Sequence, residues 1–187
     1  MLDSITTYIN DHYGSRRGLL RYCVFGIQNF AGRFRRLKQL ERGRVERLVF
    51  VCQGNICRSP VAAAYAVQRA NFPAVSFGLN CRDGAPADPR AISFANDLGL
   101  DLNTHRSSHI QHYQPQASDL VIAMEPIHLE LIDRSLLGAA QLTLLGLWLP
   151  LSTPYIHDPY TSDAAHFSRC EESVVDAVGQ VVNYLCR

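Results

Sequence analysis

Short apolar runs alternate with amphipathic stretches from residue 48 to the end of the chain. The run at 48–52 (LVFVC) is continuously apolar and stops at a Gly/Asn loop, which predicts a strand buried on both faces. The same pattern predicts strands at 75–77, 119–124 and 141–145 and helices beginning at Pro60, Asp88, Pro126 and Ala164. This alternation predicts an α/β fold, a doubly wound four-stranded parallel sheet with helices on both faces.

Residues 1–47 follow a different pattern and form a predicted N-terminal extension in front of a main domain at 48–187. Apolar and small residues recur here at steps of three or four, at Leu19, Cys23, Gly26, Ile27, Phe30, Phe34 and Leu37. Arginines lie largely between them, so we expect a basic amphipathic helix, weakened by Gly26 and Gly32. Such a helix can pack on the main domain, lie on a membrane surface or dock a partner protein.

Charge separates the same two parts of the chain. The 187 residues are 47% hydrophobic with a formal net charge of +1, which suits one domain with a substantial core. Residues 1–47 hold ten Lys/Arg against four Asp/Glu, and the remainder holds eight against thirteen. The basic extension lacks the interleaved aromatic residues that stack on bases, so we expect no nucleic-acid partner.

Six cysteines lie along the chain, at positions 23, 52, 57, 81, 170 and 186. The apolar run at 19–27 is interrupted by Arg21 and lacks a signal-peptide cleavage site, and it is too short and charged to span a bilayer. We therefore expect reduced thiols in the cytoplasm, with the extension allowing a peripheral position on the inner face of the membrane. Cys52 and Cys57 lack a second pair at zinc-finger spacing, so we expect neither metal nor cofactor.

The segment at 49–60 (VFVCQGNICRSP) carries the chemistry. The predicted strand delivers Cys52 at its carboxyl end, where open α/β sheets bind ligands. Glycine and asparagine in the following loop accept unusual backbone angles, and the helix after it begins with donors and partial positive charge. The segment therefore predicts a phosphate-sized anion cradle with a thiol at its floor. The residues expected to form this cradle are Gln53, Gly54, Asn55, Ile56, Cys57 and Ser59.

Arg58 completes the predicted cradle. A planar guanidinium can hold two phosphate oxygens and follow them as the phosphoryl group flattens in the transition state. These positive surroundings, with a hydrogen bond from Ser59, should lower the pKa of the Cys52 thiol from about 8.5 to roughly 3.5–7.5. Cys52 would then attack phosphorus as a thiolate.

The string C-x-G-N-x-C-R-S-P between a strand and a helix resembles the low-molecular-weight protein tyrosine phosphatases. The resemblance runs from about Leu48 to the C-terminus and includes VSFGL at 75–79, DPRA at 88–91, GLDLNTHRS at 99–107, DLVIAME at 119–125 and HDPY at 157–160. It implies that Ser76 braces Asn55 and that His105 joins the same hydrogen-bond network. It also implies that Cys57 forms a reversible disulfide with Cys52 after oxidation.

HDPY resembles the family's catalytic loop, and this makes Asp158 the candidate general acid and base. Hydrolysis needs a proton delivered to the leaving phenolate oxygen and another taken from the attacking water. Pro159 restricts Asp158 to an extended backbone and so directs its carboxylate. Tyr160 would form part of the aromatic wall around the substrate ring. The expected enzyme is a cysteine-dependent phosphotyrosine phosphatase that forms a phosphocysteine.

The substrate is less sharply indicated. The region after Ser76 lacks the aromatic residue that many members place at the pocket rim, and together with GLW at 146–148 this favours bacterial members that act on tyrosine autokinases of exopolysaccharide export. The expected partner is then a phosphotyrosine protein, with a membrane tyrosine autokinase as the favoured candidate.

Two other functions fit the same loop. An arsenate reductase on this scaffold needs resolving cysteines beyond the third strand, where the sequence AMEPIHLELIDRS has none. A non-catalytic phosphotyrosine-docking module would need neither the thiolate of Cys52 nor the acid of Asp158. Both alternatives are therefore less favoured than the phosphatase.

Overall fold

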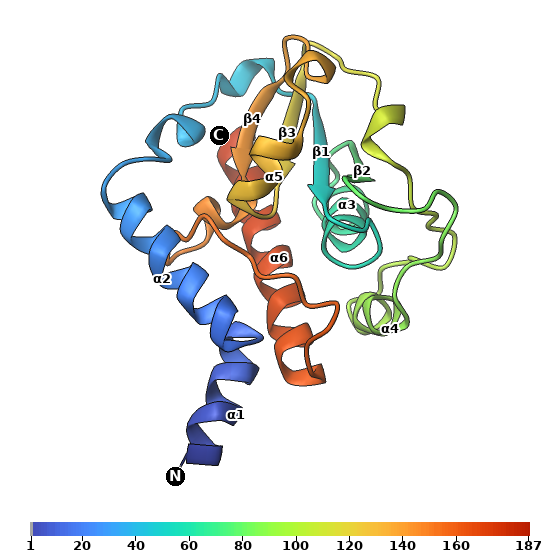
Figure 1. Ribbon diagram of the computed structural model, residues 1–187. Helices are drawn as coiled ribbons and strands as arrows, with labels where there is room; N and C mark the ends of the chain where they lie inside the picture. The colour runs from blue at the N-terminus through green and yellow to red at the C-terminus, as the bar shows by residue number, and fades with distance from the viewer. Residues whose placement is uncertain (1) are drawn as a thin grey trace.

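The computed structural model describes residues 2–187 and shows a parallel sheet between helices, with two further helices at the N-terminus (Figure 1). The strands are β1 (Arg47–Cys52), β2 (Ala74–Gly78), β3 (Asp119–Ala123) and β4 (Gln141–Leu144). The α-helices are α1 (Leu2–Tyr13), α2 (Arg16–Phe30), α3 (Arg58–Gln68), α4 (Pro89–Asp97), α5 (Pro126–Leu131) and α6 (Ala164–Leu185). Short 3-10 helices lie at Arg35–Lys38, Arg42–Arg44, Ile110–His112, Arg134–Leu136 and Leu145–Trp148.

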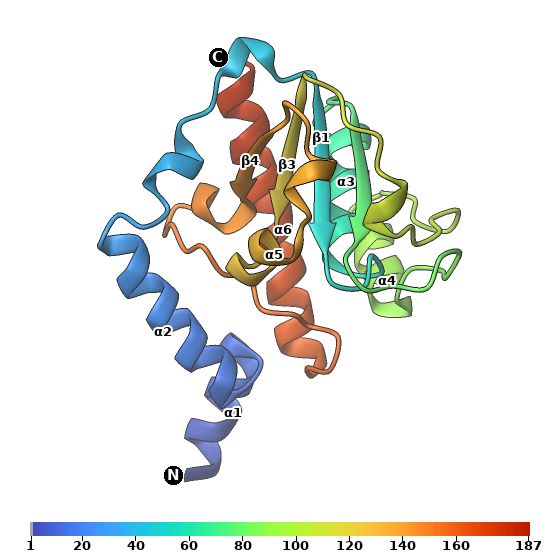
Figure 2. The same ribbon diagram turned by 45° about the horizontal axis from the view of Figure 1, so that its top comes forward.

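The four strands are parallel and lie in the order β2-β1-β3-β4, which confirms the predicted α/β fold. Figure 2 shows β4, β3 and β1 side by side. β1 lies between β2 and β3, with Val49 paired to Val75 on one side and to Val121 on the other. From β1 the chain forms β2 on one side and then β3 and β4 on the other, so the order of strands changes direction next to β1. Open α/β sheets place their ligands at such a point. The loop after β1 therefore opens at the topological switch point.

Alternate residues of β1 enter two separate cores. Leu48 and Phe50 pack with α3 and α6, the two helices that contact each other most extensively. Val49 and Val51 face the opposite way and pack with Ile110 and other residues of the connections after β2 and α5. All four side chains are fully buried, as a strand covered on both faces requires.

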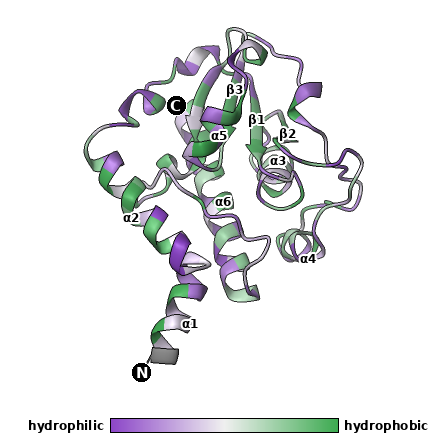
Figure 3. Cartoon of the chain, in the orientation of Figure 1, coloured by the Kyte–Doolittle hydropathy of each residue, from purple (hydrophilic) through white to green (hydrophobic). Residues whose placement is uncertain are grey.

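The N-terminal extension differs from the single helix predicted over residues 19–37. Its described residues contain two α-helices and two short 3-10 helices, and α2 ends at Phe30 because Gly32 adopts a left-handed backbone with φ of 83°. Phe34, predicted on the same helical face, is instead buried in the following turn, whereas Ile27 and Phe30 are exposed. Hydrophobic and hydrophilic residues alternate along α2 in Figure 3. The division between extension and main domain at residue 47 stays a prediction.

Within residues 2–187 there is no helix both long and apolar enough to cross a membrane.

Candidate active site

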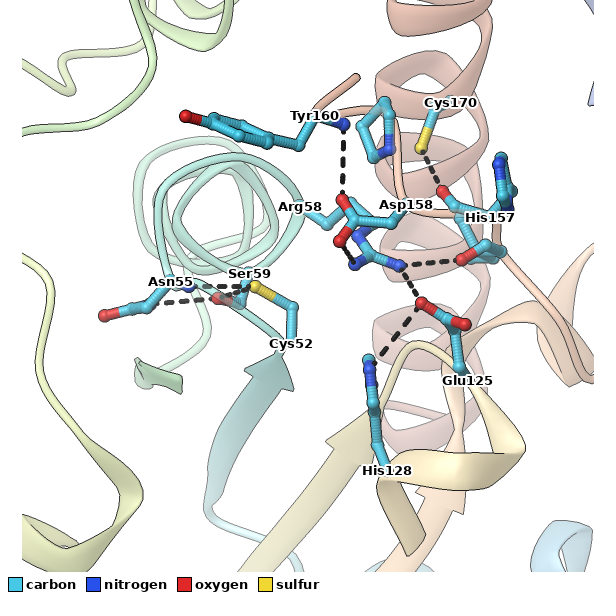
Figure 4. A network of polar contacts seen from close by, with 12 residues as sticks. Cys52, Asn55, Arg58, Ser59, Glu125, His128, His157, Asp158, Tyr160 and Cys170 are labelled. Atoms are coloured by element: carbon cyan, nitrogen blue, oxygen red, sulfur yellow. Dashed lines mark hydrogen bonds and ion pairs between the residues drawn. The ribbon is translucent and has the colours of Figure 1, made fainter. Parts of the chain in front are cut away.

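The loop between β1 and α3 wraps around the Cys52 thiol. Asn55 has a φ of 53°, the left-handed conformation that asparagine tolerates, and this turn points its backbone N–H at the sulfur. The N–H donates to Sγ of Cys52 at 3.2 Å, and the Ser59 hydroxyl lies 3.0 Å from the same sulfur (Figure 4). Ser59 lies in the first turn of α3, so a helix N-terminus also faces the thiol. These donors suit a thiolate.

The side chain of Asn55 fixes the loop to the surrounding chain. Its amide nitrogen donates to the hydroxyls of Ser59 and Ser76, each at 2.9 Å, and its oxygen accepts from the backbone N–H of Ser108 at 2.9 Å. His105 donates from Nε2 to the Asn55 carbonyl at 2.8 Å. Burial lowers the pKa of His105, so its ring is neutral and its Nε2 carries a proton for this bond. The contacts expected for Ser76 and His105 are both present.

Arg58 enters the site from the first residue of α3 and is almost fully buried. Its Nη1 donates to Oε1 of Glu125 and to the carbonyl of Ile156, both at 2.8 Å, and its Nη2 lies 3.0 Å from Oδ2 of Asp158 (Figure 4). Burial alone would lower the pKa of Arg58. The carboxylates of Asp158 and Glu125 together outweigh this effect, so the net shift of the pKa is upward. The guanidinium is therefore a fixed cation beside the thiol.

Glu125, a partner of Arg58, and His128, a neighbour of Glu125, were not assigned a role in the site from the sequence. Glu125 lies two residues after the end of β3, directly before α5, and its carboxylate reaches Arg58 across the switch point of the sheet. His128, one turn into α5, lies 3.6 Å from the same carboxylate oxygen. Burial, with the charge of Arg58, lowers the pKa of His128 to about 3, so this histidine is neutral. The signal for Glu125 was its place at the carboxyl end of a buried strand.

Asp158 lies over the cradle in the segment between β4 and α6. Its side chain is 37% exposed, and its Oδ1 accepts from the backbone N–H of Tyr160 at 3.3 Å. Arg90 of α4 holds the far end of this segment, because its guanidinium donates to the carbonyls of Tyr160 at 2.8 Å and Ser162 at 3.1 Å. The carboxylate of Asp88 in turn binds Arg90 at 2.9 Å. The expected acid is thus next to Arg58 and partly open to solvent.

A cavity of ≈ 310 Å³ opens above the thiol. This volume fits a phosphorylated aromatic side chain, and the wall combines apolar surface with polar groups that can orient a ligand. Tyr160 is 56% exposed at the rim, where the aromatic wall was expected. The other lining residues are Cys52, Gln53, Gly54, Ile56, Cys57, Arg58, Asn80, Cys81, Arg82, Ala85, Ser107 and Asp158. Arg82 was missed by the sequence analysis and adds an exposed positive charge at this pocket.

Cys57 is buried beneath the loop and differs chemically from Cys52. Burial raises the pKa of the Cys57 thiol, and the nearby carboxylates of Glu171 and Asp88 raise it further. Both cysteines are free thiols in this structure. Cys57 is therefore a buried, neutral thiol at the wall of the pocket rather than a second thiolate.

Comparison with known proteins gives one family. A family model described as low molecular weight phosphotyrosine protein phosphatase matches residues 47–187. The probable low molecular weight protein-tyrosine-phosphatase AmsI of Erwinia amylovora is 31% identical over 147 residues, which are 76% of this chain and 99% of AmsI. The low molecular weight protein-tyrosine-phosphatase Wzb of Escherichia coli K12 is 34% identical over 124 residues, covering 65% of this chain and 82% of Wzb.

Solved structures agree with these sequence matches. A crystal structure of the E. amylovora tyrosine phosphatase AmsI superposes with a TM-score of 0.65 at 30% identity, covering 76% of this chain and 95% of that one. The tyrosine phosphatase Wzb from E. coli K30, solved in complex with sulphate, gives a TM-score of 0.64 at 29% identity over 75% and 99% of the two chains. The two superpositions leave about a quarter of this chain uncovered.

Proposed function

This chain belongs to the low molecular weight phosphotyrosine protein phosphatase family, and from that membership we propose how its own residues hydrolyse phosphotyrosine. It is a cysteine-based phosphatase, and Cys52 is the nucleophile. The observation that carries this assignment is the environment of its sulfur. The Asn55 N–H donates to it, the Ser59 hydroxyl lies within hydrogen-bond distance, and a buried guanidinium is close by. Such an environment stabilises a thiolate at the floor of an anion site.

In the first step the Cys52 thiolate attacks phosphorus in line with the ester oxygen. A sulfur–phosphorus bond forms as the bond from phosphorus to the tyrosine oxygen breaks. Asp158, in its carboxylic acid form, gives its proton to the departing phenolate oxygen. Arg58 and the N–H groups of the loop hold the three phosphoryl oxygens throughout, so that the negative charge is balanced without a metal ion.

In the second step water attacks the phosphocysteine. The Asp158 carboxylate left by the first step takes a proton from this water as the new oxygen–phosphorus bond forms. The sulfur–phosphorus bond breaks and returns the thiolate with inorganic phosphate. Arg58 must release one contact with Asp158 when phosphate occupies the cradle, and its bonds to Glu125 and to the Ile156 carbonyl keep it in place while it does so.

The release of p-nitrophenol from p-nitrophenyl phosphate tests this mechanism. Wild type should turn over without added metal, and Cys52→Ser should show no turnover. Asp158→Ala should lose about 10²–10⁴-fold in kcat, because the second step needs Asp158 as its base whichever phenol has left. Wild-type protein with reduced thiols that binds phosphotyrosine but does not hydrolyse it would support a docking module instead. Arsenate reduction is not favoured, since 124–136 contains no resolving cysteine.

The natural substrate is a phosphoprotein, and we propose a tyrosine autokinase of the membrane as that substrate. The exposed Arg82 at the pocket supports an acidic sequence around the phosphotyrosine, since opposite charges at a pocket rim favour encounter. In Arg82→Glu, kcat/KM should therefore fall more for an acidic phosphotyrosine peptide than for p-nitrophenyl phosphate. Equal losses for both substrates would remove the charge argument.

We also propose that the outer face of α2 binds an anionic membrane surface. Leu20, Val24, Ile27 and Phe30 recur at steps of three or four and are exposed by 41–96%. Exposed arginines lie at both ends of this stripe, Arg16 and Arg17 before it and Arg33, Arg35 and Arg36 after it. An apolar stripe with flanking positive charge is the pattern of helices that lie in the headgroup region of anionic lipids.

Co-sedimentation with vesicles separates this proposal from docking to a protein. Wild type should sediment with vesicles that contain phosphatidylserine and far less with phosphatidylcholine alone, and added salt should weaken the binding. Ile27→Glu should abolish sedimentation. Val67→Glu, at an exposed apolar position on α3, is the matched control and should sediment like wild type. No binding to anionic vesicles would leave a protein partner as the occupant of this face.

A further inference from the structure

α2 has a second face, opposite the outer one, that lies against the segment carrying Asp158. Gly18, Arg21, Phe25 and Asn29 follow one another at steps of three and four residues, which places them on one side of the helix. Their contacts run along the segment 152–157 in reverse order. The outer face of α2 is therefore exposed to solvent, and its inner face packs on residues 152–158, here called the acid segment.

The contacts along the inner face are specific. Nδ2 of Asn29 donates to the Ser152 carbonyl at 3.1 Å, and the Phe25 ring packs on the Tyr155 ring with centroids 5.5 Å apart. The Tyr155 hydroxyl lies near the Arg21 guanidinium and raises the pKa of Arg21. The same hydroxyl lies 2.5 Å from Nδ1 of His157.

Gly14, in the turn before α2, approaches the acid segment most closely. A Cβ at Gly14 would lie 2.4 Å from Cδ2 of His157, so only glycine fits here. Its φ of 70° also favours glycine. The turn between α1 and α2 is thus closely fitted around His157, the residue directly before Asp158.

The acid segment alternates between the two sides. Tyr155 and His157 face the extension, whereas the carbonyl of Ile156 and the carboxylate of Asp158 face Arg58. A cavity of ≈ 350 Å³ lies beside it, lined by Tyr13, Tyr22, Tyr155, His157 and Cys170 among others. The main domain holds the Ile156 backbone, whose N–H donates to the Met124 carbonyl at 3.0 Å and whose carbonyl accepts from Arg58 at 2.8 Å. On the other side the extension contacts the side chains of Tyr155 and His157 beside this cavity.

We infer that the N-terminal extension is a positioning element for the general acid: the inner face of α2 and the Gly14 turn hold Tyr155 and His157, and so hold Asp158 over the cradle. Arg90 anchors the segment after Asp158, and α2 anchors it before. The matching family model begins at residue 47, so this second anchor lies outside the family's shared domain. The inference rests on the proposed role of Asp158.

Leaving-group dependence tests this positioning role. Phenolate leaves with difficulty and needs the proton, whereas p-nitrophenolate leaves readily and needs it far less. The measured quantity is kcat/KM for phenyl phosphate and for p-nitrophenyl phosphate, because kcat/KM reports the steps up to loss of the phenol. A displaced acid should lower the first value much more than the second. A general loss of folded protein would lower both equally.

Gly14→Ala and Gly32→Ala form a matched pair. Both glycines have a positive φ, 70° and 83°, so alanine strains both backbones, but a Cβ at Gly32 meets no atom within 4 Å. In Gly14→Ala, kcat/KM should fall about 10-fold or more for phenyl phosphate and less than about 3-fold for p-nitrophenyl phosphate. A slightly misplaced catalytic group would cause this difference. Gly32→Ala should match wild type on both substrates. Tyr155→Phe, which keeps the ring, should show the same asymmetry at smaller size.

Asp158→Asn separates failure of this inference from failure of the proposed mechanism. If Asp158→Asn lowers kcat/KM equally for both substrates, Asp158 is not the general acid and the mechanism fails. If Asp158→Asn shows the asymmetry but Gly14→Ala and Tyr155→Phe do not, the mechanism stands and the extension does not position the acid. Far-UV circular dichroism and the thermal midpoint identify a variant that fails to fold, in which case Tyr155→Phe decides alone.

Discussion

The Arg58 guanidinium and the Glu125 carboxylate form a buried ion pair, with 2.8 Å between Nη1 and Oε1 and exposures of 1% and 7%. The two residues come from different connections of the sheet, Arg58 from the start of α3 and Glu125 from the position directly before α5. Glu125 therefore holds the phosphate-binding cation from the side away from the substrate. A second carboxylate, Asp158, can then leave Arg58 for the leaving group without exposing an unpaired buried charge.

Removing Glu125 should lower both stability and activity. Glu125→Ala leaves Arg58 buried with one partner fewer, and such losses cost about 3–5 kcal/mol of unfolding free energy. Glu125→Gln keeps an oxygen for Nη1 and should cost less, with kcat/KM between wild type and the alanine variant. Urea denaturation and p-nitrophenyl phosphate kinetics measure the two effects. Glu130→Ala, at an exposed glutamate of α5, the helix that follows Glu125, is the control and should change neither.

Asn55 combines a backbone role and a side-chain role that two substitutions can separate. Asn55→Ala strains the left-handed φ and removes the bonds to Ser59, Ser76 and Ser108, whereas Asn55→Gly removes only the bonds. Both variants should lose at least about 10-fold in kcat/KM because the loop amides are no longer fixed. The alanine variant should also be less stable than the glycine variant by about 1 kcal/mol. Equal stability of the two would contradict a strained backbone at this position.

The sequence predicted what depends on local order and missed what depends on distant contact. Cys52 and the loop after it lie between a strand and a helix that their own residues specify, so the cradle could be predicted. The partners that Arg58 finds at Glu125 and at the Ile156 carbonyl lie 67 and 98 residues away, and no local pattern joins them. The helix predicted over 19–37 was wrong beyond Phe30 because apolar spacing alone does not show where Gly32 turns the chain.

Cys57 should protect Cys52 from irreversible oxidation. Peroxide converts the Cys52 thiolate to a sulfenic acid, and the Cys57 thiol can condense with it to form a disulfide and water. Wild type treated with hydrogen peroxide should regain activity on addition of dithiothreitol. Cys57→Ser should not regain activity, because the Cys52 sulfenic acid has no thiol to condense with and oxidises further. Cys23→Ser, at an exposed cysteine of α2, is the control and should recover like wild type. Full recovery of Cys57→Ser would remove the protective role.

Glu171 should make the protein less stable as pH rises toward 8. Its side chain is fully buried on α6, and neither carboxyl oxygen has a hydrogen-bond partner among residues 2–187. Burial raises the pKa of Glu171 to about 8 from its usual 4.5, so between these values the folded state keeps a proton that the unfolded chain releases. Unfolding free energy should therefore fall with rising pH by about 1 kcal/mol per pH unit in this window.

The amide of Glu171→Gln imitates the protonated acid and cannot ionise. The variant should therefore match wild type near pH 5 and exceed its stability at pH 8, as measured by urea denaturation at both values. Glu172→Gln, at the exposed neighbouring position, should follow wild type at both. A Glu171→Gln variant no more stable than wild type at pH 8 would mean that Glu171 ionises in the folded protein at little cost. The carboxyl would then have a polar partner behind the cradle, and its burial would not control the pH dependence of folding.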